Sequence, residues 1–553
     1  MPEPECPELE CSLPETDLLS DWLRRSAAAT PDAAAIVEDD RVTTFRELFE
    51  QSRSLAARFV EHGVKRQDRI ALVMPKTTEA IISIFASLLA GAIYVPIHPQ
   101  WPKERVEAAL ADCGARLVIE GDGSPPRIID SRINDPRISD PRITDRATGG
   151  SIPSQAATVT PIATVVDGNS LPRANAADPA VILFTSGSTG QPKGVVLSHR
   201  AVSAFVKWSA REFKIGATDR IACPSPLSFD LSTFDIFNMA LRGATCVLVP
   251  GHIAWMPRFL VQFLREARIT CWYSVPSILA GMLEEGRMAQ REYPGLRVIL
   301  FAGEVFHSTN VARLQAAVPQ AVCANLYGPT ETNVVTWCGV PRGFDGSQPL
   351  PIGLPCPYAK VTVDAASGEL LAGGESLMSG YWNRPEDTQR AFVSLEGERY
   401  YRTGDRVSRA ADGNYLFAGR LDRQVKRRGF RIELGEIETA LRGLKDILEA
   451  AAVAVDDGKG DGEMGTVVTI VAFVRPRAVG AVSLIEAKAH CARALPLYMV
   501  PDRIVFLDAM PKGNRGKIDY QTLGKIAEAL DHTALNQAAP NHAESKHAEP
   551  KLH

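Results

Sequence analysis

Short apolar runs alternate with helical patterns along most of the chain, and this alternation limits the folds that the chain can adopt. Between residues 17 and 120, the apolar runs include 69–73 and 116–119. The helical patterns that separate them span residues 44–62, 77–90 and 102–112. The alternation resumes at Ala180 and continues to about Val407. This pattern is typical of βα units on a largely parallel sheet, so we expect an α/β fold.

The length of the chain requires more than one domain. Hydrophobic cores stop growing near about 250–300 residues, and this chain has 553. We expect a large N-terminal domain of α/β layers over residues 1–421, with parallel-rich sheets covered by helices. A small, mobile α+β domain is expected over residues 422–530, where a helical pattern at 433–441 mixes with strand patterns at 467–474 and 503–507.

Two segments are predicted to be disordered. Residues 122–178 include a five-residue repeat at 131–145, in which Pro-Arg-Ile-Ser-Asp is followed by Pro-Arg-Ile-Thr-Asp. Proline at this spacing forbids a regular helix, and the apolar content is too low to offset the entropy of ordering. We interpret this segment as a surface insertion, with a binding element as the alternative. Residues 531–553 are polar, alanine-rich and aperiodic, and we expect a disordered tail.

Charge and composition exclude several classes of protein. Lysine and arginine total 61 against 65 for aspartate and glutamate, so no broad basic field is available for nucleic acid. No run approaches the roughly 20 apolar residues that span a bilayer, and the acidic, proline-bearing start differs from a secretory signal. We therefore expect a cytoplasmic protein without nucleic acid or membrane partners. The ten cysteines form no Cys-x-x-Cys pair, which argues against a zinc site or a disulfide framework.

A glycine- and hydroxyl-rich segment directly follows the predicted strand 180–184. Backbone N–H groups in such a turn can close around phosphate oxygens, and a lysine adds positive charge. The spacing differs from G-x-x-x-x-G-K-[ST], so the kinase-type phosphate loop is excluded. A plain flexible loop is the alternative. The residues concerned are Thr185, Ser186, Gly187, Ser188, Thr189, Gly190 and Lys193.

Four further segments follow in order: Asn325-Leu326-Tyr327-Gly328-Pro329-Thr330-Glu331, Tyr401-Arg402-Thr403-Gly404-Asp405, residues 419–429 and residues 513–519. Together with the phosphate loop they resemble the acyl-adenylate-forming superfamily, which includes the amino-acid adenylation domains of nonribosomal peptide synthesis, acyl-CoA synthetases and luciferases. The resemblance extends from Thr43 to about Leu523. It implies a ligase that uses ATP and Mg²⁺ to form an acyl-AMP and then a thioester.

The resemblance implies a role for each matching residue of the ATP site. Residues 185–193 would hold the phosphates, Tyr327 would stack on the adenine, and Thr330 would touch the α-phosphate. Gly328 and Lys517 would also belong to the ATP site. Glu331 would bind Mg²⁺, because a carboxylate suits a hard, oxygen-seeking cation. Asp405, helped by Arg420, would accept hydrogen bonds from the ribose hydroxyls.

Three positions are implied to serve the catalytic cycle. Lys517 matches the family's catalytic lysine, whose ammonium group would stabilise charge in the transition state alongside Thr185, Lys193 and Thr330. Asp422 matches the hinge of the small domain, and Gly429 would line the tunnel for the incoming thiol.

The segment around Asp230 indicates which acid is activated. In the amino-acid-activating members the matching aspartate pairs with the α-ammonium group, whereas a helix cap is the structural alternative. The rest of the lining is uncharged, so a small or medium neutral side chain is expected, because a buried charge would lack a partner. The lining resembles pockets for alanine; proline is the main rival, and a serine substrate stays open. The pocket residues are Asp230, Leu231, Phe234, Ser274, Leu300, Ala302, Leu326, Val334 and Val335, completed by Lys517.

The thiol is expected on a separate carrier protein. Gly373-Gly374-Glu375-Ser376-Leu377 looks like a phosphopantetheine site, but it lies where the family has its own glycine-rich segment. The 36 residues after Lys517 (553 − 517) are too few for a carrier domain. Lys426-Arg427-Arg428 is a candidate landing patch for an acidic carrier, or a plain solvated turn. The alternatives to a free-standing aminoacyl-adenylating ligase are an acyl- or aryl-CoA ligase and a non-enzymatic nucleotide-binding protein.

Overall fold

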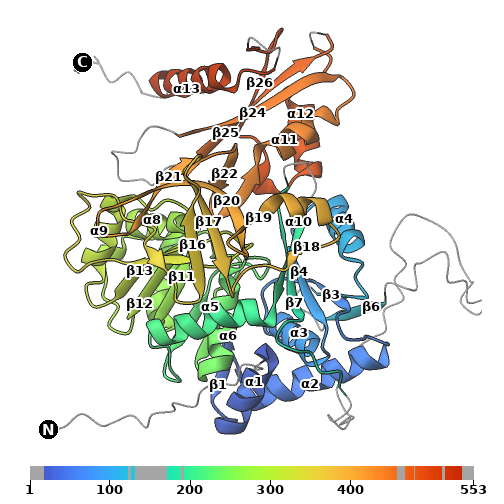
Figure 1. Cartoon of the computed structure of the whole chain (residues 1–553), viewed down its shortest axis with the longest axis vertical. Helices are drawn as coiled ribbons and strands as arrows, with labels where there is room; N and C mark the ends of the chain where they lie inside the picture. The colour runs from blue at the N-terminus through green and yellow to red at the C-terminus, as the bar shows by residue number, and fades with distance from the viewer. Residues whose placement is uncertain are drawn as a thin grey trace, which may run out of the picture. The chain divides into compact units, whose positions relative to one another are not determined.

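The computed structural model describes residues 18–121, 126–130, 171–187, 192–456, 468–478, 480–513 and 517–537. These residues fall into two compact units, a large one that extends to residue 432 and a smaller one that starts at residue 433 (Figure 1). The structure confirms the predicted α/β class, with a large N-terminal part and a smaller part that mixes helices with strands. The mobility of the small part stays a prediction.

Two large sheets form the framework of the first unit. The first sheet has the order β15-β14-β13-β12-β11-β9-β10-β1-β2 and is parallel from β13 to β1. Its strands are β1 (Ala34–Glu38), β2 (Arg41–Thr44), β9 (Arg220–Cys223), β10 (Thr245–Leu248), β11 (Cys271–Ser274), β12 (Val298–Ala302), β13 (Val322–Tyr327), β14 (Thr336–Gly339) and β15 (Leu354–Pro355).

The second sheet has the order β18-β8-β7-β4-β3-β5-β6, with a parallel centre from β7 to β5. Antiparallel strands complete it on both sides. Its strands are β3 (Arg69–Val73), β4 (Ile93–Ile97), β5 (Leu117–Glu120), β6 (Arg127–Asp130), β7 (Pro179–Thr185), β8 (Lys193–Ser198) and β18 (Gly380–Tyr381).

Helices cover both faces of each of these sheets. Side chains of α7, α8 and α9 form one core with the outer face of the first sheet, and α4 packs on the outer face of the second (Figure 1). Helices α1, α2, α3, α5 and α6 contribute to the large core that both sheets share. Parallel strands covered on both faces need apolar side chains on both, as in β4, where all five residues are buried.

The helices begin where the sequence provides caps. At the start of α2, for example, the Thr44 hydroxyl accepts a hydrogen bond from the Glu47 backbone N–H, and the Glu47 carboxylate accepts one from the Thr44 backbone N–H. The helices of the first unit are α1 (Leu19–Ala29), α2 (Phe45–Glu61), α3 (Thr78–Leu89), α4 (Lys103–Cys113), α5 (His199–Glu212), α6 (Leu231–Arg242), α7 (Pro257–Glu266), α8 (Pro276–Glu284), the 3₁₀ helix η3 (Met288–Gln290), α9 (Ser308–Ala317) and α10 (Pro385–Ala391).

A third, antiparallel sheet closes the first unit and is followed by a short hairpin. The sheet has the order β16-β17-β20-β19, with β21 also paired to β20. Its strands are β16 (Ala359–Val363), β17 (Glu369–Gly374), β19 (Phe392–Leu395), β20 (Glu398–Arg409) and β21 (Tyr415–Arg420), and the hairpin consists of β22 (Gln424–Arg427) and β23 (Phe430–Glu433).

The second unit is a three-stranded sheet with helices. Strand β25 pairs antiparallel with β24 and parallel with β26. Its elements are α11 (Leu434–Arg442), β24 (Ile447–Asp456), β25 (Val468–Pro476), α12 (Leu484–Ala494), η4 (Leu497–Met499), β26 (Arg503–Phe506) and α13 (Tyr520–Gln537).

The two segments expected to be disordered contain ordered ends. Residues 127–130 of the predicted insertion form β6, where Asp130 pairs with Arg116 at 2.5 Å. Asp178, at its other end, accepts two hydrogen bonds from the Arg66 guanidinium at 2.6 and 2.7 Å. These ion pairs supply ordering free energy that composition does not reveal. Helix α13 likewise continues to Gln537, past the expected limit of 530. Residues 131–170 and 538–553 lie outside the described residues.

Residues 422–432 belong to the first compact unit, whereas the sequence places a domain boundary at 421; that boundary stays a prediction.

Ser376, in the segment that looks like a phosphopantetheine site, is fully buried. A carrier serine needs access to a modifying enzyme, so this burial argues against a phosphopantetheine site at Ser376. Among the described residues, no helix combines the length and apolar character needed to cross a membrane.

Candidate active site

The predicted substrate-pocket residues gather at the carboxyl ends of parallel strands. Ser274 ends β11, Ala302 ends β12, and Leu326 is the neighbour of Ala302 on β13. Ligands of open α/β sheets bind at this edge. The apolar members Leu231, Phe234, Leu300, Ala302, Leu326 and Val334 belong to one core cluster, and Val335 lies in an adjacent cluster with Tyr327.

Asp230 stands at the N-cap position of α6, where its side chain does not make the usual capping hydrogen bond. Its carboxylate does accept a hydrogen bond from the N–H of Leu231, the first residue of the helix, so the helix-cap alternative stays open. A side-chain hydrogen bond links Asp230 to Thr330, so the structure brings these two predicted site residues together. Burial, with a smaller contribution from the charge of Glu331, raises the pKa of Asp230. A buried carboxylate with a raised pKa is stabilised in its ionised form when a cation binds beside it.

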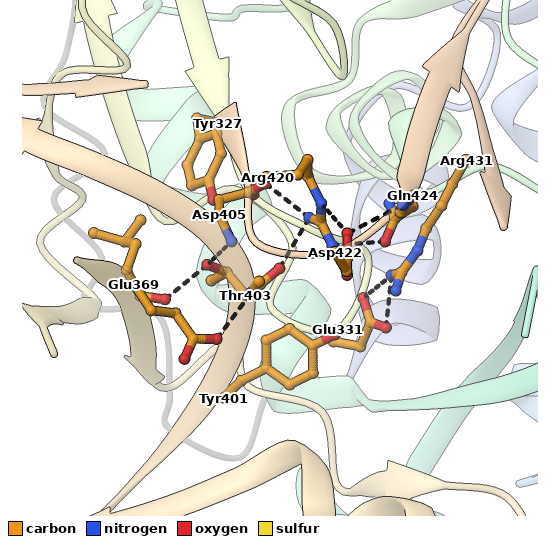
Figure 2. Close-up of polar contacts among 12 residues, drawn as sticks. Tyr327, Glu331, Glu369, Tyr401, Thr403, Asp405, Arg420, Asp422, Gln424 and Arg431 are labelled. Carbon is orange, nitrogen blue, oxygen red and sulfur yellow. Dashed lines mark hydrogen bonds and ion pairs between the residues drawn. The ribbon is translucent and has the colours of Figure 1, made fainter. Parts of the chain in front are cut away.

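Asp405 is the centre of a hydrogen-bond network at the junction of β20 and β21 (Figure 2). Arg420 lies opposite it in the strand register and donates to Asp405 Oδ1 at 2.7 Å. The hydroxyl of Tyr327 donates to Asp405 Oδ2 at 2.5 Å. Arg420 also contacts Asp422 at 2.6 and 2.8 Å and Gln424 at 2.8 Å. The predicted ribose contact and the predicted hinge residue are thus joined through one guanidinium group.

Glu331 is completely buried and is paired with a cation (Figure 2). Nη1 of Arg431 donates to both carboxylate oxygens, at 2.8 and 3.0 Å, and the Tyr381 hydroxyl donates to Oε1 at 2.7 Å. Burial alone would raise the pKa of Glu331, but the charge of Arg431 and the hydrogen bond from Tyr381 outweigh it and lower the pKa. Glu331 therefore stays ionised inside the protein.

The described part of the phosphate loop lies between β7 and β8. The Thr185 hydroxyl donates to the Lys193 carbonyl at 3.4 Å, and the Ser186 hydroxyl donates to the Arg431 carbonyl at 2.8 Å. Nζ of Lys193 lies 3.4 Å from Asp387 and 5.3 Å from the centre of the Tyr381 ring. Gly187 is buried, while Ser188, Thr189 and Gly190 lie outside the described residues.

Two glycines of the predicted site approach other backbone or side-chain atoms closely. A Cβ at Gly328 would lie 1.7 Å from the Asn333 carbonyl oxygen, so only glycine fits in this turn. At Gly429, φ is +79°, and a Cβ would lie 2.5 Å from Cγ1 of Val275, next to Ser274. The Gly429 N–H donates to Glu304 at 2.6 Å.

Lys517 belongs to the second unit, where its side chain is exposed. Its carbonyl accepts a hydrogen bond from the Gly513 N–H at 2.9 Å, and Lys512 and Ile518 form an adjacent β-bridge. The loop that carries Lys517 is thereby closed at its base. Its neighbours 514–516 lie outside the described residues.

Sequence reasoning missed several residues that contact the predicted site. Arg431 and Tyr381 bind Glu331, Asp387 pairs with Lys193, and Glu304 accepts from Gly429. A signal for Arg431 is present: Phe430 and Ile432 alternate with it in a short strand, which places Arg431 on the opposite face from two buried apolar residues.

Comparison with known proteins gives a consistent result. The model of the AMP-binding enzyme family matches residues 23–382, and that of the AMP-binding enzyme C-terminal domain matches residues 436–517. An L-proline--[L-prolyl-carrier protein] ligase of Pseudomonas fluorescens is 36% identical over 529 residues, which cover 92% of this chain and 99% of the relative. A protein of the same name from Streptomyces coelicolor is 37% identical over 520 residues, covering 91% and 95%. The crystal structure of IdnL1 matches with a TM-score of 0.71 and 29% identity, over 90% of this chain and 99% of that chain.

Proposed function

The chain belongs to the AMP-binding enzyme family, and from this premise we propose that it activates an amino acid and loads it onto a carrier protein. In the first step, the amino-acid carboxylate attacks the α-phosphate of ATP, which gives the aminoacyl-AMP and pyrophosphate. In the second, the phosphopantetheine thiol of a separate carrier protein attacks the acyl carbon, so that a thioester forms and AMP leaves. Both ligases compared above are named for this overall product. An ATP-consuming enzyme also fits the cytoplasmic location that the sequence predicts.

The observation that carries the proposal is the environment of Asp230. Its carboxylate lies at the start of α6 next to Thr330, and the other predicted pocket residues of the first unit are uncharged. The charge of Lys426 lowers the pKa of Asp230 less than burial raises it, so the substrate ammonium group would supply further positive charge that favours the ionised carboxylate. A fatty or aryl acid offers no such charge, so the site favours an amino acid.

The first unit supplies groups for the nucleotide. Asp405 can accept hydrogen bonds from both ribose hydroxyls if the Tyr327 hydroxyl moves away, and Arg420 holds the carboxylate in place through its contact with Oδ1. The ring of Tyr327 would then be free to face the adenine. Thr185, Ser186 and Lys193 lie where the phosphate loop leaves β7 and enters β8, and would bind the phosphates.

The site also fits Mg²⁺. Mg²⁺ in nucleotide sites is commonly held by one or two carboxylates together with substrate phosphates, and Glu331 is a buried carboxylate that is ionised. The described residues contain no group of three His, Cys, Asp or Glu side chains able to hold a metal. Glu331 would therefore hold the ion together with ATP, where Mg²⁺ neutralises phosphate charge. Arg431 has to release at least one oxygen of Glu331 for that contact.

We assign Lys517 the electrostatic role in adenylation. Its ammonium group would contact the substrate carboxylate and the α-phosphate as negative charge develops between them. Because Lys517 lies on the second unit, this step requires that unit to close on the site, with Asp422 as the proposed hinge and Gly429 in the wall of the thiol path.

Of the side chains that the sequence leaves open, we propose L-proline as the substrate. The Ser274 hydroxyl already accepts from Trp272 Nε1 at 2.8 Å and donates its only hydrogen to the Val275 carbonyl at 3.2 Å, so it has no hydrogen left to donate to a serine substrate. Alanine would fill less of a lining made of Phe234, Leu300 and Leu326 than the proline ring does. The names of the two ligases agree with this choice.

An ATP–pyrophosphate exchange assay with a panel of amino acids tests the function. Exchange is expected with L-proline above alanine and serine, and it requires Mg²⁺. Silence with every amino acid, combined with exchange driven by fatty or aryl acids, would favour the acyl- or aryl-CoA ligase instead.

A further inference from the structure

Four large apolar side chains are exposed on two segments that contact residues 429–430 through Trp255 and Glu304. Trp255, Met256 and Phe259, at the start of α7, are 50%, 47% and 54% exposed, and Val305 is 63% exposed. We call these four residues the apolar patch. Exposed clusters of such side chains mark interaction sites in soluble proteins more often than isolated ones do.

The two segments that carry the apolar patch both contact the hairpin of Gly429. The indole of Trp255 stacks on the ring of Phe430, with centroids 6.2 Å apart and an interplanar angle of 28°. In the other segment, the residue before Val305 is Glu304, whose carboxylate accepts from the Gly429 N–H at 2.6 Å.

A row of aromatic rings leads from the apolar patch to the proposed substrate site. Phe430 is largely buried and makes an edge-to-face contact with Phe229 at 4.8 Å, and Phe229 directly precedes Asp230. Gly429, between Glu304 and Phe430, packs against Val275, the neighbour of the pocket residue Ser274. Contacts therefore run from Trp255 of the apolar patch through Phe430 to Phe229, the neighbour of Asp230 in the amino-acid pocket.

We propose that the apolar patch is the docking surface for the phosphopantetheine-bearing carrier protein. This inference rests on the proposed function, because a thiol carried by a partner protein needs a docking surface for that protein, whereas a free thiol does not. The patch is small, which suits a partner that must leave after each transfer. Two exposed arginines border it, Arg258 at the start of α7 and Arg428 beside Gly429, so the matching face of the carrier is apolar with an acidic rim.

The test uses residues of the apolar patch that make no part of the proposed active site. Phe259→Ser and Val305→Ser remove exposed apolar surface and leave the Trp255–Phe430 stack in place. Val42→Ser is the matched control, because Val42 is 55% exposed on β2 of the same unit. Each variant is assayed for pyrophosphate exchange, for aminoacyl transfer to free pantetheine, and for loading of the phosphopantetheinylated L-prolyl carrier proteins of Pseudomonas fluorescens and Streptomyces coelicolor.

The double variant Phe259→Ser/Val305→Ser is expected to lower kcat/KM for the carrier about tenfold, mainly through KM, since burying such anchors dominates interface affinity. Exchange and transfer to pantetheine stay within about twofold of wild type, as does every activity of Val42→Ser. Unchanged carrier KM in the double variant would overturn the docking surface. An equal loss in all three assays would also overturn it, and would show that the chain itself covers these side chains. If wild type exchanges pyrophosphate but loads neither carrier, the proposed transfer step fails, and the docking surface falls with it.

Discussion

Two neighbouring carboxylates of the candidate site have opposite pKa shifts. Burial raises the pKa of Asp230, whereas the guanidinium of Arg431 outweighs burial and lowers that of Glu331. The charge of Glu331 itself contributes to the rise at Asp230. Shifts in opposite directions usually accompany different tasks. In the proposed mechanism, the substrate ammonium group would bind Asp230, and a metal ion would replace Arg431 as the cation beside Glu331.

Asp230→Asn is expected to separate activity from stability. Truncating one partner of a desolvated charge pair costs about 2–5 kcal/mol, so kcat/KM for amino-acid exchange falls at least ~30-fold. The variant is nevertheless expected to be more stable than wild type near neutral pH. Because the folded pKa lies above 3.8, the ionised Asp230 destabilises the fold at higher pH, and the variant unfolds at a higher temperature near neutral pH. The difference in unfolding temperature between the variant and wild type becomes smaller as the pH falls toward 3.8. Thermal unfolding at several pH values measures this difference. A lower unfolding temperature at neutral pH would contradict the account.

Arg431→Met is expected to destabilise the first unit by about 3–5 kcal/mol, because a buried carboxylate loses its cation. Arg24→Met is the control: Arg24 is 58% exposed and pairs with Asp21 at the same 2.8 Å, so its loss costs about 0–1 kcal/mol. The lowered pKa means that wild-type stabilisation by Glu331 is present above pH 4.5 and disappears as the pH falls below it. Urea unfolding measures both variants.

Saturating Mg²⁺-ATP should raise the unfolding midpoint of Arg431→Met more than that of wild type, and an equal rise would argue against Glu331 as the metal ligand.

Among the elements, two hairpins with the same turn differ in their surroundings. The hairpin β22–β23 turns at Arg428 and Gly429, with φ of 52° and +79°, and β19–β20 turns at Glu396 and Gly397, with φ of 51° and +82°. Positive φ at both central residues is the signature of the two-residue type I′ turn. A Cβ at Gly397 would meet nothing within 4 Å, whereas one at Gly429 would collide with Val275.

Gly429→Ala and Gly397→Ala therefore form a matched pair. Both place a Cβ in the left-handed region at about 1–2 kcal/mol, but only Gly429→Ala also displaces buried Val275. We expect Gly429→Ala to slow transfer to pantetheine and to lose more stability in urea unfolding than Gly397→Ala, which keeps wild-type transfer. Equal losses of stability in the two variants, with equal transfer rates, would remove the argument for Gly429 in the thiol path.

The elements also show how far sequence reasoning reaches. The helical patterns at 44–62, 77–90 and 102–112 agree closely with α2, α3 and α4, because apolar periodicity and caps are local properties. The sequence does not predict strand β6, because its four residues are held by antiparallel pairing with β5 and by the ion pair between Asp130 and Arg116, which a short local pattern does not reveal. The partners of Glu331 were also missed: Arg431 is 100 residues away in sequence, and a single motif does not reveal such a pairing.

At the scale of the whole molecule, the proposed machinery is divided between two compact units. The first carries Asp230, Thr330, Glu331, Asp405 and Arg420, and the second carries Lys517. One unit would thus bind the amino acid and the nucleotide, and the other would complete the adenylation step. The Arg420 guanidinium contacts both Asp405 and Asp422, which links the proposed ribose contact to the proposed hinge. Under the proposed mechanism, transfer to a thiol would use a different arrangement of the same two units.

Intact-protein mass spectrometry of a carrier protein tests the central claim most directly. The enzyme is incubated with Mg²⁺-ATP, a mixture of amino acids and the phosphopantetheinylated L-prolyl carrier protein of Pseudomonas fluorescens. A single aminoacyl adduct with the mass of a prolyl group is expected. It should require ATP, be absent without the phosphopantetheine arm and be lost with Asp230→Asn. A carrier that stays unmodified with every amino acid, while coenzyme A and a fatty or aryl acid yield an acyl-CoA, would contradict it.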